Sequence, residues 1–433
     1  MAEIKPVRAW RFNEHLAENI DELTSPLFDV VSDKQREKLY QNPYNSIHLS
    51  VPRGENAIPG AGVKLKEWKE KGIICHDDLP GIYVYYQYFN LAGSSEEYCR
   101  KGFICNIKAY DWDEEEILRH ENTIPNAVND RIDILETTQL NVSPTHGLYT
   151  DDTFELEAYM DESMLSPIYE TEDYQGVRDV LSVIHDAEVI NKFVSKIRDK
   201  KVILADGHHR YEGSLMYRKR MMEENPDHTG EEGYNYHLMF LTNTEADDLR
   251  ILPTHRIISG IENFSEEDIL EKLEEDFIIK PIEDPHIINE IILGKQWAFG
   301  LLFKENAYKI RLKPENHQMM TWNFPDKIKN LDLTVLHYFF LEKILGIKGK
   351  YQRSSENIGF DRSFADCLAQ VIKGEIQMAL ITKDISMEQV KQVCYSGYTM
   401  PQKSTHFYPK VICGFLFSSI EENEFQSLPY SCF

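Results

Sequence analysis

One short stretch of this chain strongly restricts its local fold. The apolar run from Val202 to Ala205 is typical of a buried strand, and Tyr211 to Glu224 has the pattern of a helix. Between them lies the turn Asp206-Gly-His-His-Arg210. A polar turn from a strand into a helix directs free backbone N–H groups and the positive end of the helix dipole at a ligand. The sequence therefore predicts an anion site, with Arg210 as a charged contact.

The same turn has two other interpretations. It is a polar cap of the next helix, or it holds a metal ion. Adjacent residues on a helix point about 100° apart, so His208 and His209 do not readily share one ion, whereas His208 and Glu212 lie four residues apart. The chain has no other convincing set of metal ligands, and we predict no resident metal. Gly207 permits close approach of a ligand to the backbone or a positive φ.

Charge and hydropathy narrow the class of partner. The chain has 433 residues and a net charge of −25, from 47 basic and 72 acidic residues. Such a surface repels nucleic acid, so a small polar or phosphorylated substrate is the better expectation. No apolar stretch reaches the roughly 18 to 20 residues that cross a bilayer, and the segment Met1–Pro6 lacks a signal-peptide core. We expect a cytoplasmic protein with reduced cysteines and without a nucleic-acid or membrane partner.

The order of the elements predicts a mixed α/β (α+β) fold. Strands are expected at 45–51, 81–89, 102–110, 201–205, 236–242, 249–252, 297–303, 308–312 and 377–382, with 81–89 and 102–110 antiparallel and 297–312 a hairpin. Helices are expected at 32–40, 111–120, 126–140, 186–199, 211–224, 331–345, 364–373 and 386–393, and one starts at Ser265. The pattern changes after Gly260, where we expect a domain boundary.

Four further motifs carry polar chemistry. His120-Glu121 places a carboxylate beside a histidine, as in a general base, although a polar helix end has the same composition. Lys403, Ser404 and Thr405 suit a phosphate or a carboxylate, or they form an ordinary surface loop. Pro253-Thr-His-Arg256 and Asp130-Arg131 are weaker signals, and the second is also explained by a local ion pair.

These motifs together resemble the signature of the domain-of-unknown-function 1015 family. The resemblance runs from Ile4 to Lys410 and rests on several motifs in one order: His120–Thr123, Asp130-Arg131, Asp206–Tyr211, Leu252–Arg256 and Met400–Thr405. The chain departs from the family near its start. The family usually has Pro-Pro-Tyr-Asp-Val where this chain has Pro26-Leu-Phe-Asp-Val30, so the hydroxyl of the tyrosine is missing at Phe28.

The central motif is also similar to one of the ParB and sulfiredoxin-like fold, and to that of the free serine kinases. Those enzymes move a phosphoryl group from a nucleotide to L-serine. The resemblance implies a ParB/sulfiredoxin-like core with N-terminal and C-terminal α/β additions. The implied segments are an N-terminal extension at 1–100, a core with the Asp-Gly-His-His-Arg turn at 101–260, and a C-terminal α/β domain at 261–433.

The resemblance also implies a role for each motif. The lead hypothesis is a phosphotransferase that uses ADP or ATP with magnesium and a small hydroxyl acceptor. The turn would bind the nucleotide through Gly207, His208, His209 and Arg210, the catalytic residues would be Glu121, His120 and Asp206, and the acceptor would contact Lys403, Ser404, Thr405 and Arg256. Glu121 would accept the proton of the hydroxyl.

Three alternatives remain open. The first is a non-catalytic nucleotide sensor on the same fold. The second is a ParB-like DNA-binding module, against which the charge of −25 argues. The third is a hydrolase with a metal at His208 and Glu212. The acceptor, the choice between ADP and ATP and the oligomeric state stay undetermined by the residues.

Overall fold

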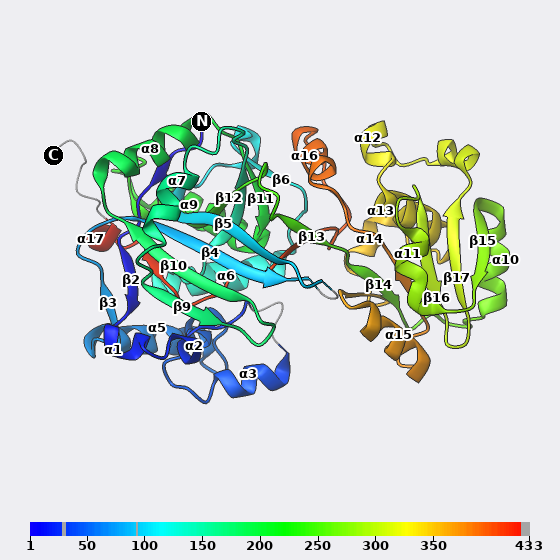
Figure 1. Ribbon diagram of the computed structural model, residues 1–433, viewed down its shortest axis with the longest axis horizontal. Helices are drawn as coiled ribbons and strands as arrows, with labels where there is room; N and C mark the ends of the chain where they lie inside the picture. The colour runs from blue at the N-terminus through cyan, green and yellow to red at the C-terminus, as the bar shows by residue number, and fades with distance from the viewer. Residues whose placement is uncertain (28–31, 92–93, 426–433) are drawn as a thin grey trace. The chain divides into compact units, whose positions relative to one another are not determined.

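The computed structural model describes residues 1–27, 32–91 and 94–425, which form two compact units. Unit 1 comprises Met1–Arg119, Thr123–Leu249 and Pro409–Phe433, and unit 2 comprises His120–Asn122 and Arg250–Tyr408. The predicted mixed α/β class is confirmed (Figure 1). The division into segments 1–100, 101–260 and 261–433 stays a prediction, and Phe28 of the family motif lies outside the described residues.

Unit 1 is built on a nine-stranded sheet. Eight of its strands follow the order β6-β11-β8-β12-β5-β4-β10-β9, and the ninth, β1, pairs with β5. The strands are β1 (Ile4–Lys5), β4 (Ile82–Asn90), β5 (Glu97–Lys108), β6 (Ile117–Arg119), β8 (Thr145–Tyr149), β9 (Tyr169–Glu172), β10 (Arg178–Ile184), β11 (Val202–Asp206) and β12 (Tyr236–Asn243). The predicted antiparallel pair β4–β5 is confirmed. The pairs β6–β11 and β8–β12 are parallel.

Both faces of this sheet are buried, and each packs against its own set of helices. Tyr83 and Tyr85 of β4 belong to one core, and Ile82 and Val84 to the other, because neighbouring side chains of a strand point to opposite faces. The first core includes side chains of α5 (Ala57–Glu70) and α6 (Pro125–Thr138). The second includes side chains of α7 (Glu157–Ser163), α8 (Ala187–Arg198) and α9 (His208–Glu224).

A second, four-stranded sheet in unit 1 joins distant parts of the sequence. Its order is β3-β2-β21-β7, formed by β2 (Ala9–Phe12), β3 (Ile74–His76), β7 (Leu140–Asn141) and β21 (Phe417–Ser419). Short helices precede or follow its strands in the sequence: α1 (Glu14–Ala17), α2 (Ile20–Leu23), α3 (Asp33–Leu39), α4 (Ile47–Ser50) and α17 (Glu422–Phe425). Ser32 and Gln35 form a capping box at the start of α3, where the sequence predicts a helix at 32–40.

Two predicted elements of unit 1 are wrong. The expected strand 45–51 is the short helix α4, because the Asn45 side chain accepts from Ile47 N at 2.9 Å and donates to Glu22 O at 2.8 Å, which turns the chain. The expected helix 111–120 is a single turn at Trp112–Glu114 followed by β6. Here sheet pairing with β11 outweighs the helical pattern.

Unit 2 contains a six-stranded antiparallel sheet with the order β15-β17-β16-β19-β14-β18. Its strands are β14 (His255–Ile258), β15 (Phe277–Ile282), β16 (Ala298–Leu302), β17 (Ala307–Leu312), β18 (Ile358–Asp361) and β19 (Met378–Ile381), and β13 (Arg250–Leu252) pairs separately with β20 (His406–Tyr408). The main helices are α10 (Glu266–Asp276), α15 (Phe364–Lys373), α16 (Met387–Tyr395) and a helix from α13 (Asp332–Val335) into a π-helical stretch at Leu336–Ile344. The predicted hairpin β16–β17 is confirmed.

The helices and the cysteines of the described residues bear on two further expectations. In residues 1–27, 32–91 and 94–425, none of the helices combines the length and apolar character needed to cross a bilayer. Six cysteines fall in the described part of the chain, and all six are free thiols.

Candidate functional site

The predicted anion site lies where β11 ends and α9 begins, in unit 1. Gly207 is the N-cap of α9 with φ 92° and ψ 26°, and it provides no side chain to cap the helix. The helix begins at His208, three residues before the predicted start at Tyr211, whose N–H donates to Gly207 O at 3.0 Å. The start of a helix also carries the positive end of the helix dipole, which favours an anion near Gly207.

Position 207 has room only for glycine. A Cβ there would lie 2.5 Å from Cγ2 of Thr145 and 2.9 Å from Nη2 of Arg210. Real Cβ atoms do not approach other atoms this closely, and the backbone conformation is unfavourable for an L side chain. Thr145 and the guanidinium of Arg210 thus pack directly against the backbone of the turn.

Asp206, Arg210 and Lys410 form a charged cluster under this turn. Arg210 Nη2 lies 2.9 Å from Asp206 Oδ2, and Lys410 Nζ contacts Asp206 Oδ1. Burial by itself would raise the pKa of Asp206, but Lys410 and Arg210 outweigh it and hold the pKa well below its usual range. The carboxylate therefore stays ionised, and the cluster of two cations and one anion is positive overall.

Arg210 is held in place by two further hydrogen bonds. Its Nη1 donates to Ser143 Oγ at 2.9 Å and to Pro144 O at 2.7 Å. The side chain is only 10% exposed, and its buried Nε has no hydrogen-bond partner among the described residues. A rigid guanidinium with an unsatisfied donor is suited to one more acceptor, such as a phosphate oxygen.

The histidines of the turn face different surroundings. His209 Nε2 accepts from Ile124 N at 3.0 Å, while His208 is buried. Glu212, which the metal alternative pairs with His208, instead accepts from Trp112 Nε1 at 2.6 Å and lies 3.7 Å from Arg119. Within the part of the chain that the structure describes, no group of three or more His, Cys, Asp or Glu residues is arranged to hold a metal ion.

The His120-Glu121 motif belongs to unit 2 together with the Lys403–Thr405 loop. Glu121 Oε1 accepts from Ser404 N at 2.9 Å and from Thr405 N at 3.4 Å. His120 Nε2 and Thr405 Oγ1 are 2.7 Å apart, and Met400 N donates to His120 O at 2.7 Å. Two motifs that are some 280 residues apart in the sequence are thus brought together, with the Glu121 carboxylate half-buried.

Arg256, which belongs to β14, holds the loop that contains Lys403. Arg256 is fully buried, and its guanidinium donates to Thr254 O at 2.5 Å, to Gln402 O at 3.3 Å and to His337 Nε2 at 3.2 Å. Burial lowers its pKa to about 10, so it remains charged at neutral pH. These bonds fix the loop from behind, and Lys403 takes a left-handed conformation with φ 55°.

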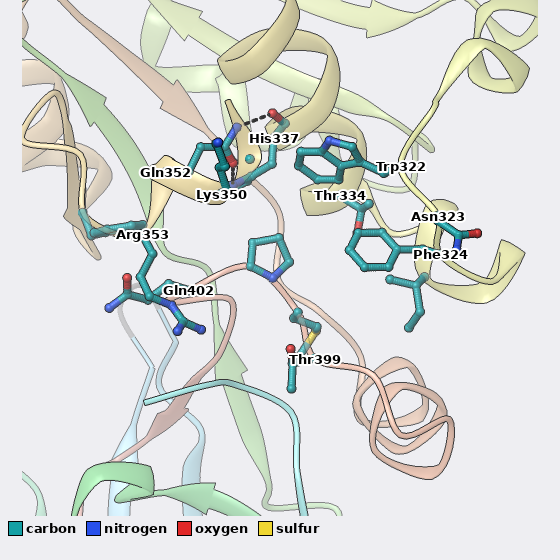
Figure 2. Close-up of a pocket in the computed structure, with 15 residues that line it drawn as sticks. Trp322, Asn323, Phe324, Thr334, His337, Lys350, Gln352, Arg353, Thr399 and Gln402 are labelled. Carbon is teal, nitrogen blue, oxygen red and sulfur yellow. Dashed lines mark hydrogen bonds between the residues drawn. The ribbon is translucent and has the colours of Figure 1, made fainter. Parts of the chain in front are cut away.

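A cavity of about 480 Å³ opens in unit 2 beside this loop. One wall is the segment Thr399–Gln402, which leads directly into the residues that hold Glu121. Figure 2 shows Trp322 and Phe324 on one side of the view, and Arg353, Lys350 and Gln402 on the other. The cavity thus combines aromatic rings, two cations and a polar loop.

The structure gathers the predicted residues into two sets. Asp206, Gly207 and Arg210 lie together in unit 1, and His120, Glu121, Ser404, Thr405 and Arg256 lie together in unit 2. Asp130 and Arg131 form an ion pair at 2.6 Å, as the simpler interpretation has it. Lys410 and the residues of the cavity were not predicted as site residues. Lys410 ends the stretch that resembles the family, but no spacing rule connects it with Asp206.

The comparisons with known proteins identify the family. The sequence matches the family described as "Protein of unknown function (DUF1015)" over residues 4–334, and the chain belongs to this family. No curated protein sequence matches the chain.

Solved structures give weaker likenesses. One is a conserved hypothetical protein from Pyrococcus furiosus, with 13% identity, a TM-score of 0.38 and coverage of 74% of this chain and 96% of the other. A free serine kinase in complex with AMP has 13% identity, a TM-score of 0.38 and coverage of 75% and 93%. SbnI with a C-terminal truncation, from Staphylococcus aureus, has 11% identity, a TM-score of 0.35 and coverage of 73% and 87%.

Proposed function

We propose that this protein is a phosphotransferase that moves a phosphoryl group from a nucleotide to a small hydroxyl acceptor. In this proposal the turn at Gly207 binds the nucleotide donor, and Glu121 takes up the proton of the acceptor. The protein acts in the cytoplasm on small molecules. The observation that carries the proposal is the positive cluster of Asp206, Arg210 and Lys410 at the N-terminus of α9.

The turn of unit 1 fits nucleotide phosphates in two respects. The positive end of the α9 dipole lies at Gly207, and Arg210 Nε has an unsatisfied donor. Phosphoryl transfer requires positioning and charge neutralisation more than covalent chemistry, and these groups provide both. His208 and His209 follow Gly207 directly and provide the N–H groups of the first turn.

A magnesium ion fits this scheme only when the nucleotide brings it. The described residues include no set of three candidate ligands, and the carboxylate of Asp206 is already engaged by Lys410 and Arg210. Magnesium needs few protein ligands when phosphates supply the others. Bound in this way, it would neutralise charge on the phosphates.

Glu121 is our candidate for the general base. Its Oε1 is fixed by the backbone of Ser404 and Thr405, which orients the carboxylate. In the proposed step a bond forms between the acceptor oxygen and the transferred phosphorus, the bond from phosphorus to the bridging oxygen of the nucleotide breaks, and the acceptor proton passes to Glu121. Ser404 and Thr405, with Lys403, would contact the acceptor, while buried Arg256 keeps their loop in position.

Two variants of Glu121 separate catalysis from structure. Glu121→Gln keeps an oxygen that accepts from Ser404 N but removes the base, so we expect nucleotide binding by calorimetry and a turnover reduced about 10²- to 10⁴-fold. Glu121→Ala also removes the anchor of the loop. The control is Glu305→Gln, an exposed residue of unit 2, for which both quantities should equal those of the wild type.

Two results would contradict the proposal in different ways. Full turnover in Glu121→Gln would remove Glu121 from the mechanism. Tight binding of ADP or ATP without transfer to any hydroxyl acceptor would instead favour a nucleotide sensor, and a crystal soaked with nucleotide and magnesium would then still place phosphates at Gly207. Absence of phosphates there would reject the nucleotide site itself.

A further inference from the structure

We propose that the 480 Å³ cavity of unit 2 binds a hydroxy acid that carries a ring, with the carboxylate at Lys350 and Arg353 and the ring against Trp322 and Phe324. The class of ligand follows from the cavity alone. Its role as the acceptor of phosphoryl transfer rests on the proposed function.

The charge of the lining selects an anion. The fifteen described residues that line the cavity include Lys350 and Arg353 but no aspartate or glutamate, although the whole chain has a net charge of −25. The third titratable residue, His337, is neutral at physiological pH, because burial lowers its pKa to about 3 and Arg256 adds to the effect. The lining side chains therefore carry a net positive charge within an acidic protein, which favours an anion in the cavity.

The opposite side of the cavity is suited to a ring. Trp322 and Phe324 are half-buried and meet edge to face, with centroids 5.8 Å apart and an interplanar angle of 87°. The indole is fixed from behind, because Trp322 Nε1 donates to Glu342 Oε2 at 3.2 Å. The indole thus keeps a defined position with Phe324 packed against it, and burying a flat apolar group against such rings is favourable.

Two buried polar atoms at the cavity need a partner. Thr334 is 0% exposed, and neither its Oγ1 nor Gln402 Oε1 has a hydrogen-bond partner among the described residues. Both residues line the cavity. Buried polar atoms are almost always hydrogen-bonded, so a ligand with a hydroxyl group would satisfy one of them. Gln402 precedes the loop that holds Glu121, which places the hydroxyl end of the ligand on that side.

The cavity is too large for the smallest hydroxy acids to fill. Small-molecule sites usually measure about 300 to 1,000 Å³ and enclose most of the ligand surface. A three-carbon hydroxy acid would leave most of the 480 Å³ unfilled, and it would not touch the aromatic side. A ring is therefore part of the inference.

Binding of three related probes to the full chain, without nucleotide, tests the ligand class by calorimetry. 3-Phenyllactate carries the ring, hydroxyl and carboxylate, whereas 2-phenylethanol lacks the carboxylate and lactate lacks the ring. We expect 3-phenyllactate to bind at least tenfold more tightly than either of the others. Equal binding of 3-phenyllactate and 2-phenylethanol would overturn the inference, and so would displacement of 3-phenyllactate by AMP, which would make the cavity a nucleotide site.

Variants of the lining test the assigned contacts. The double variant Lys350→Gln, Arg353→Gln should weaken 3-phenyllactate tenfold or more, and Thr334→Val, which keeps the shape but removes the hydroxyl, should weaken it severalfold. Lys304→Gln, on the exposed β16–β17 turn, is the control and should leave binding unchanged. Wild-type affinity in the double variant would overturn the carboxylate contacts. Binding of 3-phenyllactate without phosphoryl transfer to it from ATP would leave the ligand class intact but overturn its role as the acceptor.

Discussion

Replacing Gly207 with alanine is the sharpest test of the turn between β11 and α9. Two costs add at this position. The φ of 92° is unfavourable for an L residue by about 1–2 kcal/mol. The new Cβ would also lie 2.5 Å from Thr145 Cγ2 and 2.9 Å from Arg210 Nη2, and overpacking of this kind costs about 1–3 kcal/mol. We therefore expect Gly207→Ala to lower the free energy of unfolding by about 2–5 kcal/mol.

The chain provides a matched control for the first cost. Gly230 has a φ of 91°, and a Cβ there would meet nothing within 4 Å. Gly230→Ala should therefore lose only the conformational part, about 1–2 kcal/mol. The difference between the two variants measures the steric part at position 207.

A second change isolates the contact with Thr145. Thr145→Ser removes Cγ2 but keeps the hydroxyl that lies 3.1 Å from His237 Nε2. In the double variant with Gly207→Ala, about 1 kcal/mol or more of the steric cost should be recovered. Urea unfolding followed by circular dichroism measures all four free energies. Equal stabilities of Gly207→Ala and Gly230→Ala, or no coupling with Thr145→Ser, would refute the close packing of this turn.

Three further perturbations test other parts of the structure. Burial raises the pKa of Asp179 to about 7, so the folded state keeps a proton that the unfolded chain releases near pH 4. The free energy of unfolding should therefore fall by up to about 4 kcal/mol between pH 4 and 7. In urea titrations at several pH values, Asp179→Asn should abolish that slope. Lys410→Met leaves Asp206 with Arg210 alone, so nucleotide affinity measured by calorimetry should fall about 10- to 100-fold, and unchanged affinity would exclude the cluster from binding. Arg256→Lys keeps the charge but cannot make all three hydrogen bonds, so the amide of Ser404 should exchange its hydrogen faster, whereas unaltered protection would mean that Arg256 does not hold the loop.

The sequence predicted best those elements whose signals are local. The capping boxes and caps at Ser32, Asp186 and Ser386 marked helix starts that the structure contains. The strand pair β4–β5 followed from a long run of β-branched and aromatic residues. Predictions failed where a contact distant in the sequence decides the structure, as at β6, whose pairing with β11 outweighs the acidic helical pattern.

The candidate site, too, was predicted where its residues are adjacent in the sequence and missed where they are far apart. The turn at Gly207 was predicted because its residues are consecutive and each has a recognisable use. The partnership of Asp206 with Lys410 was not predicted, because the two residues are 204 positions apart and lysine at one position in a loop carries no signal. The cavity residues Trp322 and Arg353 were missed for the same reason, since only the fold brings them to one surface.

The order of the segments along the chain has a consequence for synthesis. Residues 250–408 interrupt unit 1, and β21, which pairs with both β2 and β7, follows this interruption. All strands of the nine-stranded sheet precede it, so a nascent chain can complete that sheet early but must wait for β21 and Lys410. At ribosomal rates of about 5–20 residues per second, the delay is roughly ten to thirty seconds. Truncation of the chain before β21 would therefore damage the unit that is made first and leave the strands of the later unit intact.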